Sequence, residues 1–273
     1  MAVKREESGR RSVEVEVHVP GTPEEVWQAI ATGPGVSSWF ARCEIEERAG
    51  GSVACHMGPG MESVGTLTAW DPPRRFAAEG QNFGPDAPTF LTEWIVEARS
   101  GGSCLVRVVH SLLADEDDWD AQLECIESGW PGFFGVLRLY LAQFRGQSCS
   151  IVRAMGSAAE TEPRLWEALA TALGIASVAE GRRFAASSSD MPPLAGIVER
   201  IGAGGHRPAL LRLEDPGPGI ALASVFTMED RTHAAMGLYL YGDEADAIAA
   251  RDEPLWQAWM AERFLSSHSR SGR

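Results

Sequence analysis

TPEEVWQAIA, at residues 22–31, has a near copy in EPRLWEALAT, at residues 162–171. When Trp27 is aligned with Trp166, an offset of 139 (166 − 27), WQAIAT lies over WEALAT with four identical residues. An offset of about half the 273-residue chain is typical of a duplicated domain and not of a short-period repeat. The sequence therefore predicts two related domains.

The first copy carries the signals of a helix N-terminus. Thr22 is a preferred N-cap residue, Pro23 suits the first helical position because no amide proton is needed there, and Glu25 completes a capping box. The Gly-Pro-Gly sequence at 33–35 is expected to end this helix. Ahead of it, valines alternate with polar residues over 13–19, which predicts a strand with one face toward water.

Strand-like segments follow, separated by turn residues such as Gly50-Gly51 and Gly101-Gly102. They are Cys43–Glu47, Ser52–Met57, Val64–Trp70, Arg75–Gln81, Phe90–Ala98 and Cys104–Leu112. From Trp119 to Phe144 the hydrophobic period becomes helical. This order predicts an antiparallel meander whose apolar face is covered by a long closing helix.

Several short sequences in this order resemble one known family. They are PEEVWQAI (23–30), Trp39, DPPRRF (71–76), WIVEA (94–98), VVHS (108–111) and the GW that opens the last helix (129–130). Residues 13–145 resemble the Hsp90-ATPase-activator-homologue branch of the START/Bet v1-like (SRPBCC) superfamily, with departures at Cys104, where a threonine is usual, and at 81–89, which is poor in aromatic residues. The resemblance implies an α+β helix-grip fold, a curved antiparallel sheet around a long C-terminal helix, often with a cavity between them. Members differ widely in function, so the fold alone decides little.

The second half repeats this order with fewer strands. Helices are expected over 162–174 and 244–264, with strands between them at Ala195–Ile201, Ala209–Leu213, Ile220–Met228 and Ala234–Tyr241. We therefore predict two helix-grip domains in tandem, at 13–146 and, in reduced form, at 150–266. A linker is expected near 146–157, a disordered tail at 1–12 and a C-terminal tail at 267–273.

Composition limits the class of protein. No apolar run approaches the roughly 20 residues that cross a bilayer, and the start, MAVKREESGRRS, lacks the apolar core of a signal peptide, so we expect a soluble, cytoplasmic protein. The net charge of the chain is −14, and residues 1–146 account for −10 of it, with 12 basic and 22 acidic residues. This negative charge disfavours nucleic acid and anionic membrane as partners. The single lysine, Lys4, argues against Schiff-base enzymes and P-loop ATPases.

Neither the cysteines nor the acidic residues predict a metal site. The five cysteines are odd in number and have no CxxC spacing, so we expect reduced core thiols and not a disulfide framework or zinc site. They are Cys43, Cys55, Cys104, Cys125 and Cys149. The acidic run at 115–118 suits a solvated loop at the N-terminus of the closing helix. We expect no metal and no cofactor.

His110 is the strongest candidate for a functional side chain. If Arg107 faces water, alternation directs His110 toward the closing helix, together with Val106 and Val108. A buried imidazole needs a partner, which could be a ligand or only a neighbouring side chain. His56 is a second candidate polar contact, although the poor alternation of its strand does not fix which way it faces.

The remaining candidate ligand contacts are apolar. With Val106 and Val108 they are Trp39, Trp94, Val96, Trp130, Phe133 and Phe134. Each of these could be plain core, but together, on a curved sheet and its helix, they are expected to line an apolar pocket with few polar groups. Glu93 and Glu97 alternate with Trp94 and Val96 and should face outward, so no catalytic carboxylate pair is identified. In such a pocket, His110→Phe is expected to alter ligand preference more than stability.

Two functions of different classes stay open. The first is a non-enzymatic protein that binds a small hydrophobic molecule in its first helix-grip domain. The second is an enzyme of the polyketide-cyclase type, in which a histidine or arginine assists proton transfer. A third, chaperone regulation, is implied only by the family resemblance.

Overall fold

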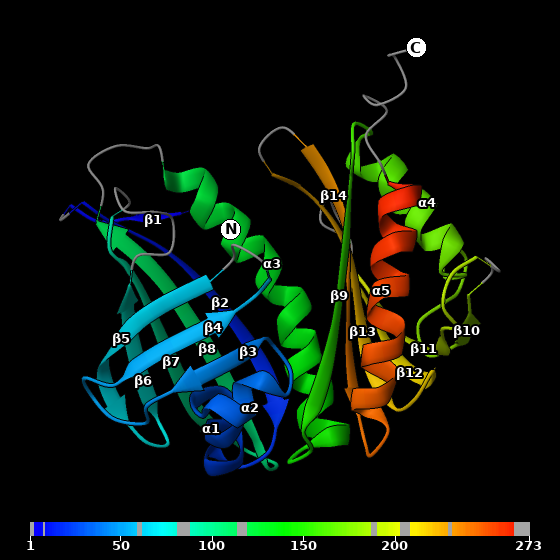
Figure 1. Ribbon diagram of the computed structural model, residues 1–273. Helices are drawn as coiled ribbons and strands as arrows, with labels where there is room; N and C mark the ends of the chain where they lie inside the picture. The colour runs from blue at the N-terminus through cyan, green and yellow to red at the C-terminus, as the bar shows by residue number, and fades with distance from the viewer. Residues whose placement is uncertain are drawn as a thin grey trace. The chain divides into compact units, whose positions relative to one another are not determined.

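The computed structural model divides the chain into two compact units, residues 1–146 and 147–273 (Figure 1). The structure describes residues 3–7, 9–58, 62–80, 88–113, 119–186, 190–202, 208–228 and 231–264. Each unit combines one antiparallel sheet with a helix after its first long strand and a long helix at its end. The chain is therefore an α+β protein with two helix-grip domains in tandem, and this prediction is confirmed.

Within the described residues, the sheet of the first domain has eight strands. Their spatial order is β1 (Lys4–Arg5), β2 (Arg10–Pro20), β8 (Ser103–Leu113), β7 (Phe90–Arg99), β6 (Arg75–Gly80), β5 (Glu62–Asp71), β4 (Ser52–His56) and β3 (Arg42–Ile45). The closing helix, α3 (Asp120–Leu139), packs against β2 and continues into a π-helical turn, η2 (Tyr140–Phe144). The first and last long strands of the domain, β2 and β8, are thus neighbours.

The helix after β2 begins as its sequence predicts. Thr22 caps α1 (Pro23–Ala31): its hydroxyl accepts a hydrogen bond from the Glu25 amide, and the Glu25 carboxylate accepts one from the Thr22 amide. The Gly-Pro-Gly sequence does more than end α1, because it forms a second short helix, α2 (Gly33–Ser37). Thr32 caps α2 by accepting a hydrogen bond from the Gly35 amide at 3.0 Å, and Pro34 fits the first turn.

The N-terminal segment is ordered where the structure describes it, so the predicted disordered tail at 1–12 is wrong for 3–7 and 9–12. β1 pairs with the start of β2, and Val3 packs on a buried cluster that includes Leu123 of α3. Arg11, which is 8% exposed, forms an ion pair with Asp120 at 2.7 Å. Charged sequence suggested disorder, but these contacts attach the segment to the start of α3.

A disulfide joins Cys43 of β3 to Cys55 of β4, which corrects the prediction of reduced thiols for these two residues. The two cysteines are directly opposite in the β3–β4 ladder, with a Cα–Cα distance of 4.2 Å. Their separation of 12 residues reflects a hairpin and not a short motif, so the spacing rules did not reveal the pair. Cys104, Cys125 and Cys149 are free thiols.

The second domain repeats the topology of the first. Its sheet, in the described residues, has the order β10 (Arg183–Ala185), β11 (Ala195–Ile201), β12 (Ala209–Asp215), β13 (Gly219–Met228), β14 (Arg231–Tyr241) and β9 (Cys149–Ala158). Here too the first strand pairs with the last. Helix α4 (Glu162–Ala172) follows the first strand, and the long helix α5 (Ala245–Arg263) closes the domain. No helix within the described ranges combines the length and the apolar character needed to span a bilayer.

β9 occupies the segment that the sequence predicted as a linker, so that prediction is wrong. Clustered small and polar residues over 146–157 suggested a linker, but the small residues at 154 and 156 are buried because α5 lies alongside β9 (Figure 1). A Cβ atom added to Gly156 would lie 2.5 Å from the carbonyl oxygen of Met260 and 2.7 Å from Cβ of Phe264. The small residues therefore mark a close helix–strand approach.

We predict that Gly156→Val destabilises the second domain by about 1–3 kcal/mol, because the added side chain meets backbone that cannot move without shifting α5. Urea unfolding followed by tryptophan fluorescence measures this, since Trp256 and Trp259 lie on α5. Met155→Val is the matched control, because Met155 is 49% exposed on the opposite face of β9. Equal unfolding midpoints for the two variants would contradict the close approach.

Candidate functional site

A stack of aromatic rings lies between the sheet of the first domain and α3. The rings of Phe90, His110, Trp130 and Phe40 follow one another at centroid distances of 5.1, 5.5 and 5.6 Å, with their planes within 23° of parallel. Phe90 belongs to β7, His110 to β8 and Trp130 to α3, while Phe40 follows α2. The imidazole is therefore held between two aromatic faces.

Both nitrogens of His110 have protein partners. Trp130 donates its indole N–H to Nε2 at 2.6 Å, and Nδ1 lies 3.0 Å from the hydroxyl oxygen of Thr92. An indole nitrogen can only donate, so Nε2 is the acceptor, and the neutral ring carries its proton on Nδ1, facing Thr92. These contacts support the structural interpretation of His110 that the sequence left open.

Burial keeps His110 uncharged. His110 is only 5% exposed, and this burial lowers the pKa of its imidazole from 6.5 to about 3. Desolvation disfavours the imidazolium, and the described structure places no carboxylate on the ring to offset it. Near pH 7 the ring is therefore neutral and has a hydrogen-bond partner on each nitrogen.

Trp94 lies between this stack and most of the other residues that the sequence predicted as ligand contacts. Its ring meets Trp130 edge-on at 5.2 Å, Phe134 at 6.0 Å and Trp39 at 6.4 Å. On the strands, Trp94 is paired with Val108, and Val96 with Val106, and all four side chains are buried. Arg107, on the opposite face of β8, forms an ion pair with Glu16 at 2.6 Å, as its predicted direction toward water requires.

The cluster reaches the surface at Phe133 and Phe40, which are both partly exposed. Their rings meet edge-on at 4.9 Å, and Phe133 also lies 6.2 Å from Trp130. The structure thus brings nine of the ten predicted site residues onto one inner surface. They are His110, Trp39, Trp94, Val96, Val106, Val108, Trp130, Phe133 and Phe134.

His56 lies apart from this group. It is on β4, opposite Arg42 and Glu62 in the two neighbouring strands, and both of those residues are exposed. Nδ1 of His56 is 3.3 Å from a carboxylate oxygen of Glu62, and its side chain is 39% exposed. Its partner is therefore a surface carboxylate.

Two members of the cluster were missed in the sequence. Thr92 belongs to the same alternating series as Trp94 and Val96 and stands opposite His110 in the β7–β8 ladder, so pairing the strands would have found it. Phe40 lies in a connection without periodicity, and no sequence signal marks it. Within the described ranges, no group of three or more His, Cys, Asp or Glu side chains could hold a metal ion, and the acidic run at 115–118 lies outside those ranges.

Several solved structures are similar to this chain. CalU16 from Micromonospora echinospora is 19% identical, over 52% of this chain and 83% of its own, with a TM-score of 0.42. DynU16, from the dynemicin biosynthetic locus, is 17% identical over 92% and 95%, with a TM-score of 0.43. The di-domain ARO/CYC BexL, from the BE-7585A biosynthetic pathway, is 14% identical over 93% and 92%, with a TM-score of 0.44. Similarity at this level assigns no activity to the chain.

No curated protein sequence matches this one. The model of the family described as polyketide cyclase / dehydrase and lipid transport matches residues 10–148, slightly more than half of the chain. This range begins with β2 and includes α3, so it contains the whole aromatic cluster. The chain belongs to the polyketide cyclase / dehydrase and lipid transport family, within the SRPBCC superfamily that its sequence resembles.

Proposed function

We propose that the first domain binds a small apolar molecule with an aromatic ring system, between its sheet and α3, and that it does so without catalysing a reaction. The observation that carries this proposal is the state of His110. Both of its nitrogens are hydrogen-bonded within the protein and its pKa is lowered to about 3. The residues proposed to contact the ligand therefore offer aromatic faces and edges, and their one histidine is not free to move a proton.

The proposed ligand enters at Phe133 and Phe40 and extends the ring stack toward Trp130. Both phenylalanines are partly exposed, so a bound ring would remove their apolar surface from water. Burial of apolar surface contributes roughly 25 cal/mol per Å², and a suitable edge-on or offset ring contact adds about 0.5–1.5 kcal/mol. Ligand selection would then depend on the size and shape of the apolar group.

An enzyme of the polyketide-cyclase type is the second candidate, and the family's description favours it. For His110 to assist proton transfer, Nε2 would have to give up the hydrogen bond from Trp130, or Nδ1 the one with Thr92. Either exchange would leave a polar group of the cluster in need of a new partner from the substrate. This requirement makes the two candidates experimentally separable.

Native mass spectrometry of the full chain, incubated with 1,8-dihydroxyanthraquinone or with a linear polyketone, tests the proposal. We expect the anthraquinone to remain bound and to be recovered unchanged. Phe133→Ala should weaken its binding about tenfold, because an edge-on contact and the apolar area of one ring are lost. Val64→Ala, at a residue 52% exposed on β5, is the control. Cyclisation of the polyketone by the parent but not by His110→Gln would establish the enzymatic alternative instead.

The neutral state of His110 predicts a pH dependence of stability. In the unfolded chain the imidazole takes up a proton below about pH 6.5, whereas in the folded protein it does so only near pH 3. The stabilisation is therefore complete above pH 6.5 and is lost as the pH falls toward 3, at up to about 1.4 kcal/mol per pH unit. Urea unfolding between pH 7.5 and 4.5 should show this slope in the parent and its loss in His110→Gln. His18→Gln, at an exposed position of β2, should follow the parent, and parallel curves for all three would contradict the prediction.

The hydrogen bonds also change the expected effect of His110→Phe. The sequence suggested an effect on ligand preference more than on stability, but a phenylalanine would leave the buried indole N–H of Trp130 without its acceptor. A buried donor without a partner costs about 1–3 kcal/mol. We therefore predict that His110→Phe lowers the free energy of unfolding at pH 7.5 by this amount, whereas His110→Gln, which keeps an acceptor, lowers it less. Thermal unfolding of both variants measures the difference.

A further inference from the structure

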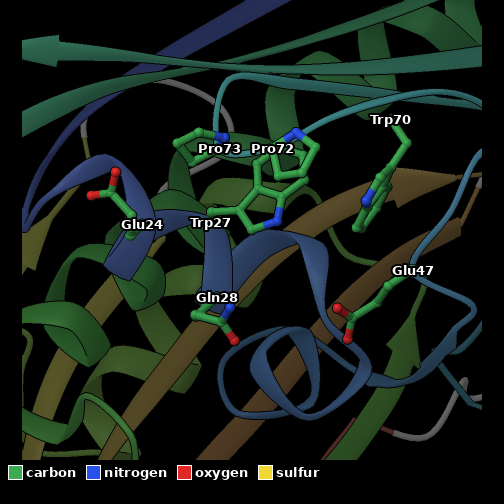
Figure 2. Close-up of a pocket in the computed structure, with 7 residues that line it drawn as sticks. All are labelled: Glu24, Trp27, Gln28, Glu47, Trp70, Pro72 and Pro73. Atoms are coloured by element: carbon green, nitrogen blue, oxygen red, sulfur yellow. The ribbon is translucent and has the colours of Figure 1, made fainter.

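A second site lies in the first domain, in a cavity of about 330 Å³ that shares no residue with the aromatic stack (Figure 2). One wall is a face of α1, where Glu24, Trp27 and Gln28 stand at positions i, i+3 and i+4. The other walls come from Trp70 at the end of β5, from the Pro72-Pro73 turn and from Glu47, which follows β3. The cavity thus combines tryptophan and proline surfaces with two carboxylates.

The two tryptophans form a corner of this cavity. Their ring centroids are 5.0 Å apart and their planes meet at 69° (Figure 2). Phe76 supports both rings, at 5.5 Å from Trp27 and 5.8 Å from Trp70. Trp27 is only 5% exposed, so packing fixes its orientation, while Trp70 is partly exposed. The partly exposed ring of Trp70, with Trp27 packed against it at an angle, presents a region of negative potential to a bound group.

The carboxylates of the cavity differ from their neighbours in the sequence. Glu25 forms an ion pair with Arg145, and Glu46 forms one with Arg48. Glu24 and Glu47, which line the cavity, make no ion pair or side-chain hydrogen bond with any other described residue. No lysine or arginine is among the residues that line the cavity, so its negative charge is not neutralised from within.

We propose that this cavity binds a small organic cation of the alkylammonium class. An ammonium group carrying methyl groups matches both features of the walls, since its charge is attracted to the indole faces and carboxylates and its methyl groups to the tryptophan and proline surfaces. The same walls disfavour anions, and an uncharged molecule of equal shape would forgo the electrostatic attraction. Because Glu24 and Glu47 are exposed, this attraction should weaken as salt is added.

The test uses two probes of the same shape. The full chain is titrated with choline and with 3,3-dimethylbutan-1-ol, its uncharged isostere, while the tryptophan indole N–H signals are followed by NMR. We expect choline to shift the signals of Trp27 and Trp70 and to bind at least about fivefold more tightly than the alcohol, the ratio that corresponds to about 1 kcal/mol. Trp70→Leu assigns one of the two signals by its disappearance.

Single substitutions then separate a built site from general attraction to an acidic protein. Glu47→Gln should weaken choline binding about fivefold, whereas Glu79→Gln, which removes the same charge at an exposed position of β6 outside the cavity, should leave it unchanged. Both residues are exposed, so both variants are expected to fold. Equal binding of choline and the alcohol, an equal effect of the two substitutions, or no shift of the Trp27 and Trp70 signals would each overturn the proposal. None of these outcomes bears on the ligand of the aromatic stack.

Discussion

Pairing of the first long strand with the last is the constraint on which each domain depends. β2 pairs with β8 along its whole length, from Arg10 with Leu113 to Pro20 with Ser103, and β9 pairs with β14 in the same manner. The closing helix follows the last strand in the sequence, so this pairing brings it near the first strand, and α3 packs against β2 as α5 does against β9. Contacts so distant in the sequence close large loops, which is entropically costly and slows folding. The position of the helix on the sheet, and with it the aromatic cluster, therefore depends on this one strand pairing.

The Trp130–His110 hydrogen bond shows how a polar contact can specify an apolar interior. Ring packing alone would allow α3 to shift or rotate by small steps. The buried indole N–H of Trp130, however, has a single acceptor, so a shift of α3 would break this hydrogen bond. Buried polar groups are costly when unpaired, so such a bond favours a single arrangement of helix and sheet. Thr92 extends the same restraint to β7. The histidine thus contributes rigidity to a surface that is otherwise held by weakly directional contacts.

Local signals in the sequence predicted much of the first domain. The capping box at Thr22, the alternation over β2 and the helical period over α3 each depend on neighbours within a few residues, and each was found. What was missed depends on partners distant in the sequence. β9 contains small residues because α5 lies on it, and Cys43 meets Cys55 only once their strands pair. In the candidate site, alternation placed the inner side chains on one face, but only the strand register joins Thr92 to His110.

A chain made of two similar domains can misfold by exchanging equivalent segments. The close approach of α5 to β9 opposes this exchange. At the offset of 139, Val15, Val17 and Val19 of β2 correspond to Ala154, Gly156 and Ala158 of β9. If β2 took the place of β9, a valine would stand where even one added carbon comes within 2.5 Å of the α5 backbone. The two copies have thus diverged in side-chain volume along their first strands, and this difference disfavours β2 in the place of β9.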